Sequence, residues 1–300
     1  MIENRIIGQN EATSTLIHAV IRNKLGIERR DKPKGIFLFV GESGVGKTEL
    51  ALTLSEALFH DKSSVIRYDM SEYSDATSSS KLLGSAPGYV GYDETNNALE
   101  KIRKKPYSVV LFDEIEKAHP SVLSLLLQIF DNGYLTDSLG RKINFRNTYV
   151  IMTSNAYRAS DFDKKVGFVS GDDYNSIRAR LNDRFPSEFL NRIDDIILFA
   201  PLEHSSLKLI ASKKLEDTVK RFSTISIDIS FEDSVASFIA SKAKKEGGGA
   251  RPIIRFIEKE IENKITDMII SGDLTKGEVA KIIIESEGIA LEKKSPATHG

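Results

Sequence analysis

Apolar residues in the first two thirds of the chain form short continuous runs that alternate with segments of helical periodicity. The runs at 35–40, 108–113 and 148–155 are rich in β-branched or aromatic residues and are bounded by turn formers, so they predict buried strands. Continuously apolar strands fit a parallel sheet whose two faces are both covered. We therefore expect an α/β domain at residues 1–201.

Helical periodicity at 49–59 and 120–130 predicts helices between these strands. Residues 133–145 carry two short runs around "DSLG", which indicates a hairpin or a projecting loop. Residues 156–187 are polar and interrupted by glycine, so they predict a long exposed insertion followed by a helix.

The pattern becomes mainly helical after residue 201. Residues 251–270 predict one amphipathic helix, and 278–284 predict a strand. We expect a smaller, mainly helical domain with a short strand region at 202–291, and a disordered tail at 292–300.

Composition narrows the class of protein. Hydrophobic residues make up 40% and charged residues 28% of the 300 residues, which is typical of a globular protein. Lys and Arg (42) balance Asp and Glu (43), so we expect no nucleic-acid partner. The absence of cysteine excludes disulfides, Cys–zinc sites and Cys nucleophiles. Without a long apolar run or a signal-peptide pattern, we expect no membrane partner and a cytoplasmic location.

The segment "GESGVGKT" (41–48) matches the phosphate-binding P-loop pattern and stands between a predicted strand and a predicted helix. Its glycines let backbone N–H groups face phosphate oxygens, and the following helix adds the positive end of its dipole. Lys47 can reach the β- and γ-phosphates, and the Thr48 hydroxyl can ligate Mg²⁺. The predicted ATP/ADP-binding residues are Gly41, Glu42, Ser43, Gly44, Val45, Gly46, Lys47, Thr48 and Glu49.

Two carboxylates end the apolar strand predicted in "VVLFDE" (109–114). Asp113 suits coordination of Mg²⁺, directly or through water. Glu114 suits a general base that positions and polarises an attacking water. A protein that only binds nucleotide needs Asp113 but no base at Glu114, so the pair favours ATP hydrolysis.

Six segments stand in the order found in Clp/heat-shock AAA+ unfoldases: "GESGVGKT", "GSAPGYVGY", "VVLFDEIEKAHP", "LTDSLGRKINFRNTYVIMTSN", "FLNRID" and "GGGARP". From about residue 4 to 290, the chain resembles the second, C-terminal ATPase module of two-module members, and is most similar to the ClpA type. The resemblance implies a AAA+ P-loop NTPase fold, in which a parallel sheet with helices on both faces precedes a small helical lid domain.

The resemblance also implies roles for single residues. Ile6 and Ile7, in "RIIGQ", match a segment that packs on adenine. Asn155 matches the sensor-1 residue, which orients the attacking water. Arg192, in "FLNRID", matches the arginine finger, which reaches the nucleotide of a neighbouring subunit. Arg251, in "GARP", matches the sensor-2 arginine, which contacts the γ-phosphate.

The glycine-rich stretch "GYVG" lies where the family places its central pore loop. An aromatic ring there would grip an extended polypeptide by its area, with little dependence on sequence. The predicted pore residues are Gly88, Tyr89, Val90 and Gly91.

The polar segment "DKKVGFVSGDD" (163–173) carries the apolar tripeptide Val166, Gly167 and Phe168. An apolar triplet in an exposed loop often marks a contact. In protease-coupled family members a hydrophobic-Gly-hydrophobic loop in this region docks on the ClpP peptidase ring, whereas disaggregating relatives lack it. The alternative is a triplet that folds back on its own domain.

These features predict a homo-hexameric, ATP-hydrolysing unfoldase and translocase that delivers unfolded or tagged protein substrates to a ClpP-type peptidase, with adaptor proteins as further partners. One alternative is a disaggregase that acts without a peptidase. Another is a nucleotide-switched scaffold that barely hydrolyses ATP. The joint presence of Glu114, Asn155, Arg192 and Arg251 argues against the scaffold.

Overall fold

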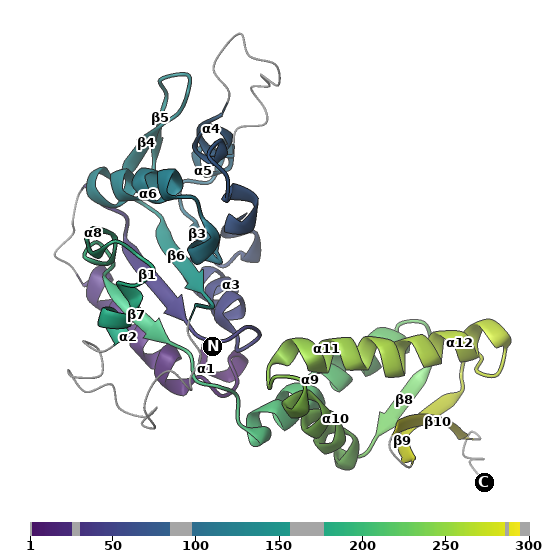
Figure 1. Cartoon of the computed structure of the whole chain (residues 1–300). Coiled ribbons are helices and arrows are strands. Elements are labelled where there is room, and N and C mark those ends of the chain that lie inside the picture. Colours follow the sequence, from purple (N-terminus) through teal and green to yellow (C-terminus); the bar gives the residue numbers. More distant parts are fainter. Residues whose placement is uncertain (1, 26–30, 85–97, 157–176, 286–287, 295–300) are drawn as a thin grey trace. The chain divides into compact units, whose positions relative to one another are not determined.

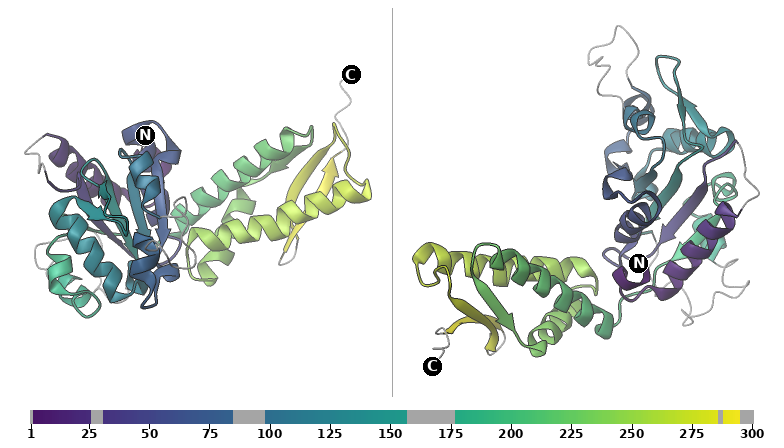
Figure 2. Two further views of the ribbon diagram at one scale, coloured as in Figure 1. Left: turned by 90° about the horizontal axis from the view of Figure 1, so that it is seen from above. Right: turned by 180° about the vertical axis from the view of Figure 1, so that it is seen from behind.

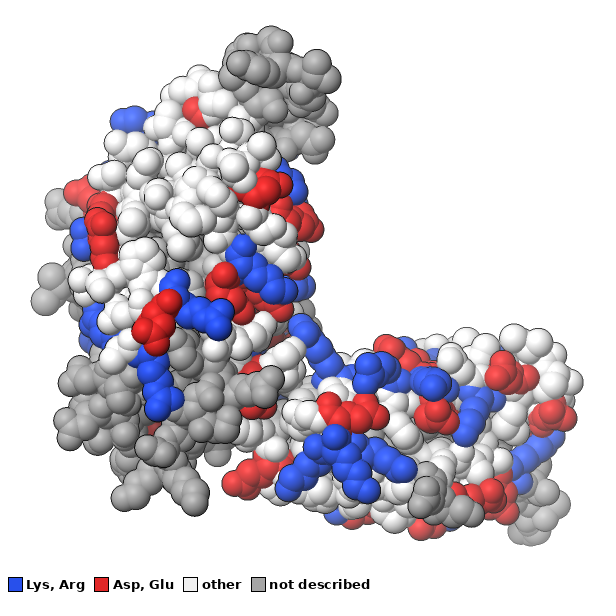
Figure 3. All heavy atoms as spheres, in the orientation of Figure 1, with Lys and Arg blue, Asp and Glu red and all other residues white. Residues whose placement is uncertain are grey.

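The computed structural model describes residues 2–25, 31–84, 98–156, 177–285 and 288–294 (Figure 1). The chain divides into two compact units, Met1–Ala200 and Pro201–Gly300, and each is described by itself. No helix among the described residues is long and apolar enough to cross a membrane. On the face in Figure 3, the basic and acidic side chains of the described residues are interspersed in both units.

Unit 1 is built on a five-stranded sheet in the order β2-β3-β6-β1-β7, and all neighbouring strands are parallel. Its strands are β1 (Gly35–Val40), β2 (Val65–Asp69), β3 (Val109–Asp113), β6 (Tyr149–Ser154) and β7 (Asp195–Leu198). Its helices are α1 (Ile2–Arg5), α2 (Asn10–Lys24), α3 (Lys47–Phe59), α4 (Ser78–Leu83), α5 (Glu100–Lys104), α6 (Pro120–Asn132) and α8 (Ser187–Leu190), with short 3₁₀ turns η1 (Lys62–Ser64), η2 (Met70–Tyr73) and η4 (Ile115–Lys117).

Both faces of this sheet are buried, as the alternation of side chains along β1 shows. Ile36 and Leu38 join a core that includes the apolar face of α6, whereas Phe37 and Phe39 join a second core with α2 and α3. Successive side chains of a strand point to opposite faces, so two separate cores on alternate residues require helices on both sides (Figure 2). The predicted fold class is confirmed.

The strands expected at 35–40, 108–113 and 148–155 are confirmed as β1, β3 and β6, and the helices expected between them as α3 and α6. The segment 133–145 was expected to form either a hairpin or a projecting loop. It forms a hairpin of β4 (Tyr134–Thr136) and β5 (Lys142–Asn144). The two outer strands, β2 and β7, were not predicted. Edge strands are short and only partly buried, so they carry a weaker apolar signal.

Unit 2 has its own apolar core beneath a three-stranded sheet in the order β10-β9-β8. Strands β8 and β9 are parallel, whereas β9 and β10 are antiparallel. The elements are α9 (His204–Ser223), β8 (Asp228–Phe231), α10 (Asp233–Lys245), α11 (Ala250–Ile257), a π-helical turn η6 (Glu258–Glu262), α12 (Asn263–Ser271), β9 (Val279–Glu285) and β10 (Gly288–Lys294).

The single helix expected at 251–270 contains a π-helical turn. Four buried isoleucines in this region recur every fourth residue, which is longer than the 3.6-residue turn of an α-helix. A wider turn in the middle compensates for the drift and keeps the isoleucines on one face. They are Ile253, Ile257, Ile261 and Ile265.

Strand β10 extends to Lys294, so the prediction of a disordered tail from residue 292 was wrong for 292–294. Antiparallel pairing of Glu292, Lys293 and Lys294 with β9 orders this end of the chain. Charged residues gave no local indication of a strand. Residues 295–300 lie outside the described part of the chain.

Candidate functional site

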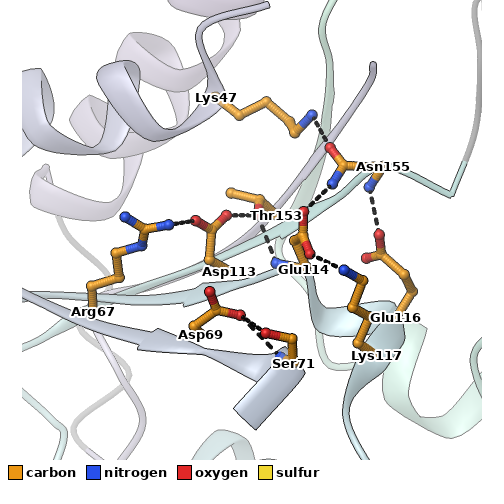
Figure 4. Close-up of polar contacts among 10 residues, drawn as sticks. All are labelled: Lys47, Arg67, Asp69, Ser71, Asp113, Glu114, Glu116, Lys117, Thr153 and Asn155. Carbon is orange, nitrogen blue, oxygen red and sulfur yellow. Dashed lines mark hydrogen bonds and ion pairs between the residues drawn. The ribbon is translucent and has the colours of Figure 1, made fainter. Parts of the chain in front are cut away.

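The predicted nucleotide residues converge at one edge of the sheet in unit 1. The P-loop follows β1, Asp113 and Glu114 end β3, and Asn155 follows β6. These three strands are adjacent and parallel, with Val40 opposite Ser154 and Phe112 opposite Met152. Their carboxyl ends therefore meet at the same edge, where open α/β sheets bind ligands (Figure 4).

The P-loop has the backbone that its glycines predict. Gly44 (φ 81°) and Gly46 (φ 109°) adopt the left-handed conformation, and Gly46 caps the N-terminus of α3. A Cβ on Gly41 would lie 2.8 Å from the Cβ of Phe199, so this position requires a close backbone approach. The loop thus leads directly into a helix of 13 residues, whose N-terminal N–H groups suit an anion.

Lys47 is buried, with 6% of its surface exposed, and its ammonium group bridges two parts of the site. It donates to the backbone carbonyls of Gly41 (2.5 Å) and Glu42 (2.6 Å). It also donates to Oδ1 of Asn155 at 2.8 Å. The first residue of α3 is therefore bonded to the residue that follows β6.

Asn155 extends this chain of contacts to the acidic residues after β3. Its Nδ2 donates to Oε1 of Glu114 at 2.9 Å, and its backbone N–H donates to Oε1 of Glu116 at 2.9 Å. Asn155 thus joins Lys47 to Glu114 through the two ends of one amide group (Figure 4).

Glu114 has a left-handed backbone (φ 56°), which is rare for a residue other than glycine. Such conformations are unfavourable by about 1–3 kcal/mol and are concentrated at functional sites. The Glu114 side chain is 25% exposed, and its Oε2 lies 2.5 Å from Nζ of Lys117. Both carboxylate oxygens are therefore engaged, one by Asn155 and the other by Lys117.

Asp113 is more deeply buried than Glu114, with 8% of its side chain exposed. Arg67 on β2 donates to its Oδ2 at 2.5 Å, and the Thr153 hydroxyl donates to its Oδ1. Thr153 in turn accepts the backbone N–H of Glu114 at 3.0 Å. Sequence reasoning missed Arg67 and Thr153, since they become neighbours of Asp113 only through strand pairing.

The donor set fits Mg²⁺. No group of three or more His, Cys, Asp or Glu that could hold a metal occurs among the described residues. Mg²⁺, however, commonly uses one or two protein oxygen ligands together with phosphate oxygens and water. The Thr48 hydroxyl, in the first turn of α3, and the Asp113 carboxylate are ligands of that kind.

The two isoleucines expected at the adenine differ in their surroundings. Ile6 is 4% exposed and belongs to the core shared with α2 and α3, whereas Ile7 is partly exposed. The neighbouring Gln9 is a residue that sequence reasoning missed. Its buried amide donates to the carbonyls of Val45 (3.2 Å) and Ala200 (2.7 Å) and accepts the N–H of Ala200 (3.1 Å), so it joins the P-loop to the end of unit 1.

Arg192 lies at the opposite edge of the sheet from the P-loop. The N–H of Asp194 donates to the carbonyl of Ile36, near the start of β1, whereas the P-loop follows the end of that strand. Since β1 has 6 residues, the two edges are roughly 20 Å apart at about 3.3 Å per residue. Arg192 donates to Asp131 at 2.6 Å, and this hydrogen bond lowers the pKa of Asp131.

The remaining predicted residues do not belong to the described part of unit 1. Arg251 is exposed in the first turn of α11, in unit 2. The pore residues 88–91 and the docking tripeptide 166–168 lie outside the described residues.

Comparison with known proteins identifies the family of the chain. Residues 32–196 match the family described as AAA domain (Cdc48 subfamily), and residues 202–282 match the C-terminal, D2-small domain of ClpB protein. The chain is 43% identical over 289 residues to the ATP-dependent Clp protease ATP-binding subunit ClpC of Staphylococcus saprophyticus, an alignment that covers 94% of this chain and 35% of the relative.

Two further relatives are similarly close. The chaperone protein ClpB of Malacoplasma penetrans is 42% identical over 294 residues, covering 98% of this chain and 41% of that protein. ClpC of Staphylococcus aureus (strain USA300) is 42% identical over 295 residues, covering 96% and 36%. This chain therefore spans between 35% and 41% of the length of these relatives. With both family matches in order along it, the chain belongs to the Clp/heat-shock family of AAA+ ATPases and corresponds to their second ATPase module.

Proposed function

We propose that this chain is the ATP-hydrolysing module of a ring-forming protein unfoldase. The observation that carries the proposal is the hydrogen-bonded series Lys47–Asn155–Glu114, which joins the phosphate-binding loop to the acidic strand end. A site that only bound nucleotide would need the P-loop. It would not need the Glu114 carboxylate to be hydrogen-bonded, through the Asn155 amide, to Lys47 of that loop. The nucleotide-switched scaffold is therefore the weaker alternative.

Each residue has a role that follows from its contacts. Lys47, at the end of the P-loop, stabilises the negative charge of the β- and γ-phosphates. Glu114 accepts the proton of the attacking water, and Asn155 orients that water together with Glu114. Thr48 and Asp113 would hold Mg²⁺, which would supply neutralising charge at the phosphates when bound. Arg67 and Thr153 hold the Asp113 carboxylate in a fixed orientation.

Arg192 acts on a neighbouring subunit in this proposal. Its position at the amino edge of the sheet, far from the P-loop of its own chain, supports a role across an interface. A homo-hexamer would bring each Arg192 to the next nucleotide, where it stabilises charge that develops during phosphoryl transfer. Arg251, from unit 2, and Ile6 and Ile7 would complete the nucleotide contacts.

The mechanical output proposed is translocation of unfolded or tagged protein substrates, gripped in the pore by Tyr89 and Val90 between Gly88 and Gly91. We propose delivery to a ClpP-type peptidase through Val166, Gly167 and Phe168. The relatives carry the names of both a protease subunit, ClpC, and a chaperone, ClpB, so a disaggregase without a peptidase is the second candidate.

The catalytic assignment is tested with Glu114→Gln. The amide keeps an acceptor for Asn155 but removes the base, so ATP turnover should fall at least about 10²-fold while nucleotide binding is retained. Glu72→Gln, an exposed carboxylate after β2, is the matched control and should keep wild-type turnover. Wild-type turnover in Glu114→Gln would show that Glu114 is not the base.

The partner is tested separately by deleting Val166–Phe168. Degradation of an unfolded substrate by an added ClpP-type ring should be lost, while ATP turnover is unchanged. If degradation continues after the deletion, Val166–Phe168 is not the docking segment. If the intact chain supports disaggregation but no degradation, the disaggregase is the correct function.

A further inference from the structure

We propose that Glu116 is a positioning residue for ATP hydrolysis, which acts by holding the backbone of Asn155 so that its amide can bridge Lys47 and Glu114. This inference rests on the proposed function, because it concerns the same reaction. Glu116 is the second acidic residue after β3 and lies two positions beyond the proposed base, Glu114. The family resemblance assigned no role to Glu116.

Glu116 accepts a backbone N–H that has no acceptor in the strand pairing. Strand β6 ends at Ser154, whose carbonyl accepts the N–H of Gly41. The next N–H, that of Asn155, is instead accepted by Oε1 of Glu116 at 2.9 Å. A buried or half-buried N–H without an acceptor is unfavourable, so this carboxylate determines where the chain leaves β6.

The route of the backbone after β3 makes this contact available. Glu114 has a left-handed conformation, and the 3₁₀ turn η4 follows it immediately. In this arrangement Glu114 and Glu116 approach Asn155 from the same side, one at its side-chain amide and the other at its backbone (Figure 4). The strained backbone at Glu114 therefore places two carboxylates around one residue.

The burial of Glu116 indicates more than a surface contact. Its Oε2 is inaccessible to solvent and has no hydrogen-bond partner within the described part of the chain. Leaving a buried carboxylate oxygen without a partner is unfavourable, and native structures have few such groups. A charged acceptor, however, binds an N–H more strongly and at shorter range than a neutral one. We infer that the strong acceptor fixes Asn155 at the expense of stability.

Loss of the hydrogen bond between Glu116 and Asn155 should lower kcat and leave nucleotide affinity nearly unchanged. The Asn155 amide is bonded to both Lys47 and Glu114, so a displaced backbone would move it relative to the attacking water. Misplacement by about 1 Å in an active site can lower the rate about 10²-fold. Lys47 keeps its bonds to the carbonyls of Gly41 and Glu42 in such a variant, so the P-loop remains able to bind nucleotide.

The test compares Glu116→Gln with Glu116→Met in the complete 300-residue chain. The two side chains have similar length, but only Gln can accept the N–H of Asn155. We expect Gln to keep kcat within about 5-fold of wild type and Met to lower it about 10- to 100-fold. Binding of a fluorescent methylanthraniloyl-ATP should change less than about 3-fold in both variants. Glu72→Met is the matched control.

A double-mutant cycle with Asn155→Ala separates positioning from a general effect on the fold. If Glu116 acts only through Asn155, then neither substitution at position 116 lowers kcat further once the Asn155 amide is absent. The Gln variant carries this test even if Met does not fold, since its smaller loss of kcat should also vanish in the Asn155→Ala background. Melting temperatures establish that each variant is folded at the assay temperature.

Three results would overturn the inference. They are equal kcat in the Met variant and wild type, equal losses in the Gln and Met variants, and losses that add fully to that of Asn155→Ala. Glu114→Gln distinguishes these from failure of the proposed function. If it removes turnover while Glu116→Met does not, only the role of Glu116 is wrong; if Glu114→Gln itself hydrolyses ATP normally, the proposed catalytic site is wrong.

Discussion

Lys47 is the residue through which the phosphate-binding loop contacts the rest of the site. Its buried ammonium group holds two carbonyls of the loop and the Asn155 side chain. A lysine in such a place acts as a point charge at the end of a flexible stem, which can move from one oxygen acceptor to another. Phosphate oxygens are also hydrogen-bond acceptors, and they carry more negative charge than the carbonyl oxygens that Lys47 contacts here.

Substitution of Lys47 by Met should therefore weaken nucleotide binding at least about 10-fold, because a charge-assisted hydrogen bond contributes about 1.5–3 kcal/mol. Titration with methylanthraniloyl-ATP measures this change. Lys105→Met removes a lysine that contacts Ser63 at the surface and should leave affinity unchanged. Unaltered affinity in Lys47→Met would contradict the assignment of the loop.

At the scale of elements, the hairpin β4–β5 depends on one buried carboxylate in its turn. Asp137 accepts the N–H groups of Leu139 (3.0 Å) and Arg141 (2.8 Å) and the Nε of Arg141 (2.8 Å). Each strand has only 3 residues, so a short ladder alone gives little stability. The turn is held mainly by the Asp137 side chain.

Replacing Asp137 by Ala should destabilise the hairpin locally by about 1–3 kcal/mol, because two backbone N–H groups lose their acceptor. Hydrogen exchange of the amides at 134–144 should then accelerate about 5- to 100-fold, while exchange in β1 is unchanged. Asp61→Ala, which removes a similar cap from η1, should affect only its own turn. Unchanged exchange in the hairpin would show that its strands do not need Asp137.

At the scale of the whole molecule, the two units have separate apolar cores. Leu126 is fully buried in the core between the sheet and α6 of unit 1, and Leu215 is fully buried in the core of unit 2. A domain with its own core can in principle fold alone. Residues 1–200 and 201–300 should then unfold as distinct units.

Leu126→Ala and Leu215→Ala are a matched pair that tests this independence. Each should lower the stability of its own unit by about 2–5 kcal/mol, through lost burial and a residual cavity. Differential scanning calorimetry of the chain should show the transition of one unit shifted, by about 4–20 °C for unit 1 or about 8–40 °C for unit 2, and the other nearly unchanged. If both transitions shift together in each variant, the units unfold as one.

The site could be predicted from the sequence wherever its residues are local to a strand end. The P-loop and the pair Asp113 and Glu114 were predicted from motifs at the ends of buried apolar runs, whereas Asn155 was predicted only through the family resemblance. Parallel pairing brings these strand ends together. The contacts of Arg67, Gln9 and Glu116 could not be predicted in this way. Each joins segments at least 36 residues apart, and Gln9 and Ala200 are 191 residues apart.

The sequence by itself determined the fold class, the helices between the strands, the family and the phosphate-binding chemistry, because these depend on local periodicity and closely spaced motifs. Only the tertiary structure decided the edge strands β2 and β7, the extension of β10 to Lys294 and the π-helical turn at Glu258–Glu262. It also decided which acceptor each polar group of the site finds. The physical reason is that strand pairing and burial are interactions between distant segments, and a local pattern contains no information on which partner is adjacent.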